Sequence, residues 1–337
     1  MSKILITGGT GYIGSHTAVV FIEAGYEVVI VDNLSNSNIE VLNGIEKITG
    51  KKPEFHKIDL SVEKETKEFF EQHSDFDVIV HFAAYKAVGE SVKKPLKYYK
   101  NNLNSLMNIL EAMTKYSIQN LIFSSSCTVY GEPDELPVSE KAPIKIANSP
   151  YGNTKQIAEE IIRDTIKANK KLNSINLRYF NPIGAHPSAL IGELPLGVPN
   201  NLIPFLTQTV AGLREKLSVF GNDYNTPDGT PVRDYIHVVD LAKAHLVAAE
   251  RLISGKNKNN LEYFNLGTGR GYSVLEIIKI FEKVTGEKVN YEITNRREGD
   301  VEKVWADPTY ANQELGWKTE LSLEDALKSA WEWQKRL

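Results

Sequence analysis

The sequence predicts an α/β fold: a doubly wound parallel sheet with a smaller, partly interleaved C-terminal α/β domain. In the first half, short β-branched runs alternate with longer amphipathic stretches, as in sheets covered by helices on both faces. After about residue 180 this rhythm stops, and seven prolines and glycines fall between Pro182 and Pro199. At about 150 residues per domain, 337 residues suggest two domains. We expect one domain at 1–180, with returning segments near 235–270, and a second at 181–337.

Each expected element has a local signal. Strands are predicted where β-branched and aromatic residues cluster: Ile4–Thr7, Glu27–Val31, Glu54–Asp59, Val78–Phe82, Asn120–Ser124 and Ser174–Tyr179. Apolar residues at helical spacing predict helices at Tyr12–Ala24, Glu63–His73, Pro95–Tyr116 and Tyr151–Lys170. Later in the chain we expect a helix at Leu202–Leu213, a strand at Leu217–Phe220 and a final helix at Ser322–Leu337. The helix–strand pair Val238–Ile253 and Glu262–Leu266 is expected to return to the first sheet.

Composition excludes several classes of function. The 39 basic and 43 acidic residues give a net charge of −4, so no basic field favours nucleic acid. No apolar run approaches the roughly 20 residues of a membrane span, and the start shows no signal-peptide pattern. Cys127 is the only cysteine, and His81, His186 and His237 lack metal-ligand spacing. We therefore expect a cytoplasmic enzyme with no metal, no nucleic-acid partner and no membrane partner.

A glycine-rich turn follows the first predicted strand. Gly8, Gly11 and Gly14 allow a tight turn, a close approach of the backbone to a pyrophosphate, and close packing of helix on strand. The following helix start offers free N–H groups to phosphates. Asp32 ends the second strand, where an acid can bind ribose hydroxyls, and Asn33 rather than a basic residue follows it. This pattern predicts a Rossmann-type site for NAD rather than NADP, with Asp59 near the adenine.

The candidate catalytic residues are Tyr151, Lys155 and Ser126. Tyr151 and Lys155 are four residues apart at the start of a predicted helix, so they share one helix face. A nearby cation favours the phenolate, and bringing a tyrosine pKa from about 10 to about 7 takes roughly 4 kcal/mol. Ser126 lies furthest along a serine-bearing strand end, where its hydroxyl can relay a proton between substrate and phenol.

These motifs resemble those of the extended short-chain dehydrogenase/reductases. Further segments narrow the resemblance to the UDP-glucose 4-epimerase family, nearly end to end from Lys3 to about Trp333. The segments are Phe82-Ala-Ala-Tyr-Lys-Ala-Val-Gly-Glu-Ser91, Leu177-Arg-Tyr-Phe-Asn-Pro-Ile-Gly-Ala-His-Pro187, Pro199-Asn-Asn-Leu202, Val232-Arg-Asp-Tyr-Ile-His-Val238 and Arg296-Arg-Glu-Gly-Asp300.

The resemblance implies a chemistry that composition and spacing do not reach. A tightly held NAD would act as a catalyst, and UDP-glucose and UDP-galactose would interconvert at C4 through a 4-keto sugar. The implied cofactor contacts are Gly8, Gly11, Tyr12, Ile13, Gly14, Asp32, Asn33, Asn36, Asp59, Leu60, Phe82, Ala83, Lys86, Asn101, Ser126, Tyr151, Lys155 and Phe180. The implied substrate contacts are Ser126, Tyr151, Asn181, Asn201, Leu202, Phe220, Arg233, Arg297, Asp300 and Val304. The family is commonly a homodimer, here through Pro95–Tyr116 and Tyr151–Lys170.

Val304 bears on specificity. Some family members carry a bulky tyrosine beside the 2-substituent of the sugar, and others carry a small residue. Valine is much smaller than tyrosine, so the resemblance predicts room for an N-acetyl group. We therefore expect UDP-GlcNAc and UDP-GalNAc as additional substrates.

Three other readings remain at this stage. A nucleotide-sugar 4,6-dehydratase of the same superfamily would need an Asp-Glu pair after Ser126, but Cys127 and Thr128 stand there. A decarboxylating relative is not excluded by residue chemistry alone. A non-catalytic NAD-sensing protein would have no need for Ser126, Tyr151 and Lys155 together.

Overall fold

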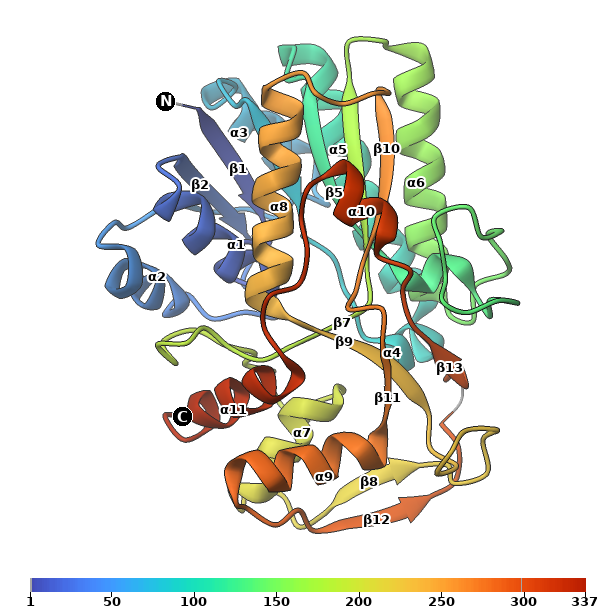
Figure 1. The fold of residues 1–337 in the computed structure, drawn as a ribbon. Helices are drawn as coiled ribbons and strands as arrows, with labels where there is room; N and C mark the ends of the chain where they lie inside the picture. The colour runs from blue at the N-terminus through green and yellow to red at the C-terminus, as the bar shows by residue number, and fades with distance from the viewer. Residues whose placement is uncertain (1, 298) are drawn as a thin grey trace.

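A computed structural model describes residues 2–297 and 299–337, and its main body is a seven-stranded parallel sheet (Figure 1). The strand order is β10-β6-β5-β4-β1-β2-β3. The strands are β1 (Lys3–Thr7), β2 (Glu27–Asp32), β3 (Glu54–Lys57), β4 (Val78–His81), β5 (Asn120–Ser126), β6 (Asn173–Tyr179) and β10 (Leu261–Leu266). This arrangement confirms the predicted doubly wound α/β fold.

Helices cover both faces of this sheet, and the strand side chains alternate between the two layers. Ile4 and Ile6 of β1 pack in one core with helices α1 (Tyr12–Glu23), α2 (Val41–Thr49) and α8 (Val238–Ile253). Leu5 faces the other way, into a core with α3 (Glu63–Gln72), α5 (Pro95–Tyr116) and α6 (Pro150–Ala168). All three side chains are fully buried, and each contributes about 1.5–3 kcal/mol to folding.

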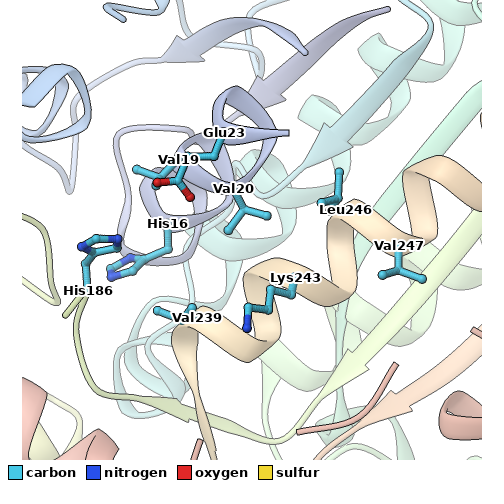
Figure 2. Close-up of a pocket in the computed structure, with 9 residues that line it drawn as sticks. All are labelled: His16, Val19, Val20, Glu23, His186, Val239, Lys243, Leu246 and Val247. Atoms are coloured by element: carbon cyan, nitrogen blue, oxygen red, sulfur yellow. The ribbon is translucent and has the colours of Figure 1, made fainter. Parts of the chain in front are cut away.

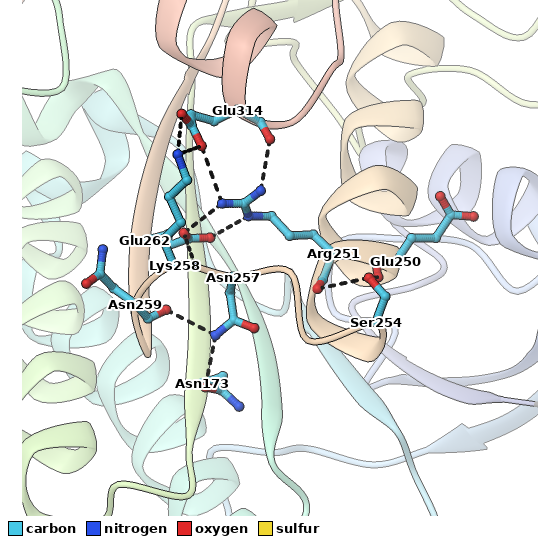
Figure 3. A network of polar contacts seen from close by, with 9 residues as sticks. All are labelled: Asn173, Glu250, Arg251, Ser254, Asn257, Lys258, Asn259, Glu262 and Glu314. Carbon is cyan, nitrogen blue, oxygen red and sulfur yellow. Dashed lines mark hydrogen bonds and ion pairs between the residues drawn. The ribbon is translucent and has the colours of Figure 1, made fainter.

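The segment after strand β9 (Val232–His237) returns to the main sheet. Helix α8 packs against α1, and β10 pairs in parallel with β6 at the edge of the sheet, as expected for this helix–strand pair. A polar network fastens the pair (Figure 3): the Arg251 guanidinium of α8 donates to both carboxylate oxygens of Glu262 on β10, at 2.7 and 2.9 Å. Arg251 also donates to the backbone carbonyl of Glu314 at 2.9 Å, which ties in α10 (Thr309–Glu314).

Smaller elements lie beyond the carboxyl ends of the main strands (Figure 1). One small sheet has the order β11-β9-β13, with β7 also paired to β9, and a second joins β12 to β8. Helices α7, α9 and α11 pack around them on a third core. The bounds are β7 (Asn181–Ile183), β8 (Leu217–Phe220), β9 (Val232–His237), β11 (Gly271–Ser273), β12 (Tyr291–Thr294), β13 (Lys303–Val304), α7 (Leu202–Val210), α9 (Val274–Thr285) and α11 (Leu323–Gln334).

The structure corrects several expected boundaries. Strand β5 continues to Ser126 instead of ending at Ser124, because Ser124–Ser126 keep pairing with β6 as far as Tyr179. The segment rich in proline and glycine contains one short strand, β7, although regular structure was not expected there. Helix α4 (Val88–Lys93) and the 3₁₀ turn Cys127–Tyr130 were also not predicted.

Among the described residues, no helix combines the length and the apolar character needed to cross a membrane.

The Arg251–Glu262 pair gives a test of how the returning segment is held. Arg251 is 9% exposed and the Glu262 side chain 2%, so Glu262→Gln leaves a buried guanidinium short of its main counter-charge. We expect the free energy of unfolding in urea to fall by about 3 kcal/mol. The double variant Arg251→Met with Glu262→Leu should recover most of this loss. Lys258→Ala, which removes an exposed partner of Glu314, should change the free energy of unfolding by less than about 1 kcal/mol. A Glu262→Gln protein as stable as the wild type would contradict this account.

Candidate active site

The main sheet has a switch point between β1 and β4, where the strand order reverses. Strands β1, β2 and β3 follow one another toward one edge of the sheet, and β4, β5, β6 and β10 follow one another toward the other edge. Ligands of open α/β sheets bind in the crevice at such a point. Here the loops after the two strands approach closely: a Cβ on Gly8 would lie 2.8 Å from the backbone nitrogen of Ala83. Gly8 also has a φ of +67°. Only glycine fits this position, and its missing side chain leaves the backbone exposed to the crevice.

Helix α1 begins at this crevice with its end groups free for a ligand. Gly11 is the N-cap residue and has no side chain to satisfy the first N–H groups. A Cβ on Gly14 would lie 2.4 Å from the Gly8 carbonyl oxygen, so the helix start and the turn pack at a distance that only glycine permits. A helix start without a side-chain cap, beside a turn rich in glycine, fits a pyrophosphate.

Asp32 organises the neighbouring loop at the end of β2. One carboxylate oxygen accepts hydrogen bonds from the Leu34 backbone at 2.8 Å and the Ser37 hydroxyl at 3.1 Å. The other accepts from the Thr10 backbone at 3.3 Å, which connects Asp32 to the glycine turn. A carboxylate held between these two loops is placed to receive ribose hydroxyls.

Asp59 lies beyond β3 and belongs to the same edge of the sheet. Asn33 donates to its carboxylate at 3.1 Å, and the Ser61 hydroxyl donates at 2.6 Å. Partial burial raises the pKa of Asp59, but these hydrogen bonds outweigh it and the pKa is lowered. Leu60 beside it is buried, whereas Asn36 is exposed in the loop after β2.

The candidate catalytic residues come together at the carboxyl ends of β5 and β6. Ser126 ends β5, and Tyr151 and Lys155 lie on the first turns of α6, whose N-cap is Ser149. The Ser126 hydroxyl lies near the Tyr151 phenol and accepts a hydrogen bond from the backbone N–H of Thr128 at 3.2 Å. The Lys155 ammonium is 5.9 Å from the centre of the Tyr151 ring and donates to the backbone carbonyl of Ser124. A substrate hydroxyl placed between the oxygens of Tyr151 and Ser126 would complete a proton relay.

Burial dominates the electrostatics of this group. It raises the pKa of Tyr151 to about 12, although the nearby Ser126 hydroxyl acts in the opposite direction. Burial lowers the pKa of Lys155 to about 8, against the attraction of Glu159. The expected lowering of the Tyr151 pKa by Lys155 is therefore not what these protein groups produce by themselves. A phenolate at neutral pH requires further positive charge in the crevice.

A buried ion pair below the catalytic strand was missed by sequence reasoning. Arg178 of β6 donates to both oxygens of Glu159 on α6, at 2.9 and 2.6 Å, and the Ser125 hydroxyl donates to Glu159 at 2.6 Å. Arg178 also donates to the Tyr130 hydroxyl at 2.9 Å. The helical spacing of Glu159 behind Lys155 was the one signal available, and its partner is distant in sequence.

The predicted substrate residues form a second group below the sheet. Arg297 donates to both oxygens of Asp300, at 2.7 and 3.1 Å, and the Arg233 guanidinium lies 3.8 Å from the same carboxylate. The Arg297 guanidinium also lies 5.6 Å from the centre of the half-exposed Phe220 ring. Two guanidinium groups beside an aromatic face can bind a diphosphate and a base together.

Glu193 links the predicted cofactor residues to the predicted substrate residues, and its role was not predicted. Its carboxylate oxygen accepts from the Lys86 ammonium at 3.0 Å and from the Asn201 amide at 2.7 Å. Lys86 in turn lies 5.7 Å from the centre of the Tyr12 ring, and the Tyr12 hydroxyl donates to the Gly184 carbonyl at 2.6 Å. One carboxylate thus connects an expected cofactor residue to an expected substrate residue.

The remaining predicted residues take different positions around the crevice. Ile13 lies on the first turn of α1, Phe82 follows β4, and Phe180 is buried between β6 and β7. The Asn101 amide donates to Asn102 at 3.0 Å. Those on the substrate side are Asn181 on β7, Leu202 at the start of α7, and Val304, which is the register partner of Arg233.

A separate cavity of about 390 Å³ lies between α1 and α8 (Figure 2). His16 reaches into it; burial lowers the pKa of this histidine to about 3, and its Nδ1 pairs with the Tyr12 carbonyl at 2.7 Å. The other lining residues, mostly apolar, are Val19, Val20, Glu23, His186, Val239, Lys243, Leu246 and Val247. None of the candidate catalytic residues lines this cavity.

Comparisons with known proteins agree with this geometry. A family model described as GDP-mannose 4,6 dehydratase matches residues 5–330. The chain is 52% identical to the UDP-glucose 4-epimerase of Dictyostelium discoideum, over 98% of this chain and 95% of that protein. It is 50% identical to that of Bacillus subtilis, over 98% and 96%.

Solved structures give the same picture. The UDP-glucose 4-epimerase of Bifidobacterium longum in complex with NAD+ and UDP superposes with a TM-score of 0.96 at 45% identity, over 99% of this chain and 98% of that chain. The UDP-Glc/GlcNAc 4-epimerase of Campylobacter jejuni gives 0.84 at 38% identity over the whole of both chains. The chain therefore belongs to the UDP-glucose 4-epimerase family of the extended short-chain dehydrogenase/reductases.

Proposed function

We propose that this chain interconverts UDP-glucose and UDP-galactose by epimerisation at C4, with NAD as a bound redox catalyst. The observation that carries the proposal is the placement of Ser126, Tyr151 and Lys155 together at the end of β5, beside a glycine turn shaped for a pyrophosphate. Relatives about half identical over nearly their whole length are UDP-glucose 4-epimerases. Cys127 and Thr128, which stand where a 4,6-dehydratase would carry acids, disfavour that alternative.

The crevice residues would hold NAD in a consistent order along the sheet. The Gly8–Gly14 turn and the start of α1 would bind the pyrophosphate, Asp32 the adenosine ribose, and Asp59 the adenine side. Lys155 would hold the nicotinamide ribose. When bound, NAD supplies the acceptor and donor for the hydrogen at C4, and its nicotinamide ring adds the positive charge that Tyr151 needs.

Tyr151 moves the proton in this proposal. Its phenolate oxygen accepts the proton of the C4 hydroxyl, with Ser126 sharing the hydrogen bond, as the sugar becomes a 4-ketose. After the sugar turns about its bond to the diphosphate, Tyr151 returns the proton to the C4 oxygen. Ser126 is buried and Tyr151 is half-buried, so the bound cofactor and substrate would complete the exclusion of water from this exchange.

The substrate group would hold the nucleotide firmly and leave the sugar free to turn. Arg233 and Arg297 are charge-assisted donors for the diphosphate, Asp300 an acceptor for a uridine ribose hydroxyl, and Phe220 a face for the uracil. The pairing of both guanidinium groups with Asp300 keeps them at one end of the crevice.

We also propose a cytoplasmic homodimer that associates through α5 and α6. In support, α5 exposes Leu96 and Met107, which are 70% and 40% accessible. The two-domain division at about residue 180, with the return near 235–270, is proposed on the basis that β10 pairs with β6 across the smaller elements.

A second candidate activity is the interconversion of UDP-GlcNAc and UDP-GalNAc. Val304 is 5% exposed and packs with Phe180 and Tyr130. Its register partner is Arg233, so its side chain belongs to the wall next to the proposed diphosphate site. A valine there takes up less volume than the tyrosine that some family members carry.

Tyr151→Phe tests the proposed function. The purified wild-type protein should convert UDP-galactose to UDP-glucose with no NAD added, and NMR measures the conversion. Loss of the proton-transferring hydroxyl should reduce turnover by about 10²- to 10⁴-fold. Tyr291→Phe, a change at an exposed tyrosine, should have no effect. Full activity of Tyr151→Phe would refute the role of Tyr151, and a wild-type protein inactive even with NAD would favour the non-catalytic reading.

Glu193→Ala tests the link between the cofactor side and the substrate side. Without the carboxylate, Asn201 and Lys86 lose their common acceptor. Since a hydrogen bond to a charged group contributes about 1.5–3 kcal/mol, we expect the KM for UDP-galactose to rise about tenfold or more, with a smaller change in kcat. Glu332→Ala, at an exposed glutamate of α11, is the control. An unchanged KM with a reduced kcat would show that Glu193 does not position the nucleotide.

Val304→Tyr tests the second candidate activity in the same NMR assay. The larger side chain should abolish conversion of UDP-GalNAc and spare that of UDP-galactose. Val301→Tyr, a change at a neighbouring valine, serves as the control. Equal loss of both substrates in Val304→Tyr would rule out selective exclusion, and a wild-type protein inactive on UDP-GalNAc would rule out the activity itself.

A further inference from the structure

Two histidines and a glutamate meet at the outer edge of the main sheet, far along the strand order from the catalytic strand β5. Glu54 and His56 are two residues apart on β3, so their side chains share one face of this edge strand. His73 is the C-cap residue of α3. The Glu54 carboxylate lies 2.6 Å from His56 Nε2 and 3.8 Å from His73 Nδ1, and the three ligand atoms all lie within 4.8 Å of one another.

The surroundings hold these groups in place. The Phe69 ring stacks on His73 with centroids 5.0 Å apart and meets the edge of His56 at 5.2 Å. Phe69 is itself buried in the core, so it fixes both imidazoles from below. The carbonyl end of α3, at His73, favours a positive charge nearby.

The cluster is open to solvent on its outer side. The side chains of His56 and His73 are 26% and 24% exposed, and that of Glu54 is 45% exposed. The nearby Lys3 ammonium is engaged with Asp75 at 3.0 Å and Glu27 at 3.6 Å, so its charge is largely balanced by these carboxylates. An ion can therefore enter without displacing a packed side chain.

We propose that Glu54, His56 and His73 bind one divalent transition-metal ion of the zinc class. Two imidazole nitrogens and one carboxylate oxygen are a ligand set that zinc accepts, with water completing a tetrahedron. Tetrahedral bonds of about 2.0–2.2 Å require donor atoms some 3.5 Å apart, which small side-chain rotations achieve from the observed spacing.

The ion would have a structural role and take no part in catalysis. Among the described residues, strand β3 pairs only with β2, and a metal shared with His73 would tie it to α3. Two residues after β3 stands Asp59, on the adenine side of the proposed cofactor site. Binding of the ion would therefore stabilise the edge of the sheet that receives the adenosine, an effect that does not depend on the proposed reaction.

Zinc titration of the purified protein tests the site. After treatment with a chelator and its removal, isothermal titration with ZnCl₂ should show one site per chain, and zinc should raise the thermal unfolding midpoint. His56→Gln and His73→Gln should each weaken binding about tenfold or more, and both together should abolish it. His186→Gln, a change at a partly buried histidine outside the cluster, should leave zinc binding intact. All variants are first compared with the wild type by circular dichroism, and Glu54→Gln replaces any that is misfolded.

Three outcomes would overturn the proposal. The first is an equal zinc affinity in the wild type and in the double variant. The second is a loss of zinc affinity in His186→Gln as large as that in His56→Gln or His73→Gln. The third is zinc binding that leaves the thermal unfolding midpoint unchanged. Epimerase turnover without zinc should be the same in the wild type and in both single variants, so failure of the metal site and failure of the proposed function are distinguishable.

Discussion

The close approach of the loops after β1 and β4 is the constraint on which the site depends. Gly8 lies so near Ala83 that a single added methyl group would meet the backbone of the loop that follows β4. Because the strands cannot separate there without breaking the centre of a buried sheet, the turn must bend with a positive φ and α1 must start immediately. The free helix end, the position of Asp32 and the crevice itself all follow from this contact between two backbones.

Burial works against the catalytic chemistry in the same region. Tyr151 and Lys155 both lie where the protein favours their neutral forms, with pKa values of about 12 and about 8. The charge pair Arg178–Glu159 lies directly beneath and is fully satisfied, so it holds the strand and helix in place and leaves little field for Tyr151. A site built in this way keeps Tyr151 protonated at neutral pH until a cation arrives in the crevice, and proton transfer is then tied to cofactor occupancy.

The sequence was informative where the signal is local. The first six strands and the four long helices of the main sheet follow from β-branched runs and helical spacing, and the glycine turn and the Tyr–Lys pair follow from fixed spacings. The end of β5 was placed two residues short because three serines look like a strand end, whereas pairing with β6 carries them onward.

Other features depend on contacts that no local pattern encodes. Glu193 lies in a segment rich in proline and glycine, and its role appears only when Lys86 and Asn201 are brought beside it. The same holds for the cluster of Glu54, His56 and His73, which joins an edge strand to the end of a helix. The strands β9, β11 and β13 are too short and too mixed in composition to show a periodicity, because their pairing is set by the packing of distant segments. Helix α9 is different: its capping box of Ser273 and Glu276 was a readable signal that was overlooked.

The late position of β10 in the chain has a consequence for synthesis. Until Leu261–Leu266 leave the ribosome, β6 is the last strand on its side and its outer backbone groups have no partner. About 80 residues separate the end of β6 from the start of β10, so at typical translation rates that edge stays open for seconds or longer. The nascent chain therefore passes through a stage with an unpaired strand edge, and protection of that edge by chaperones would matter more for this fold than for one whose sheet is completed in order.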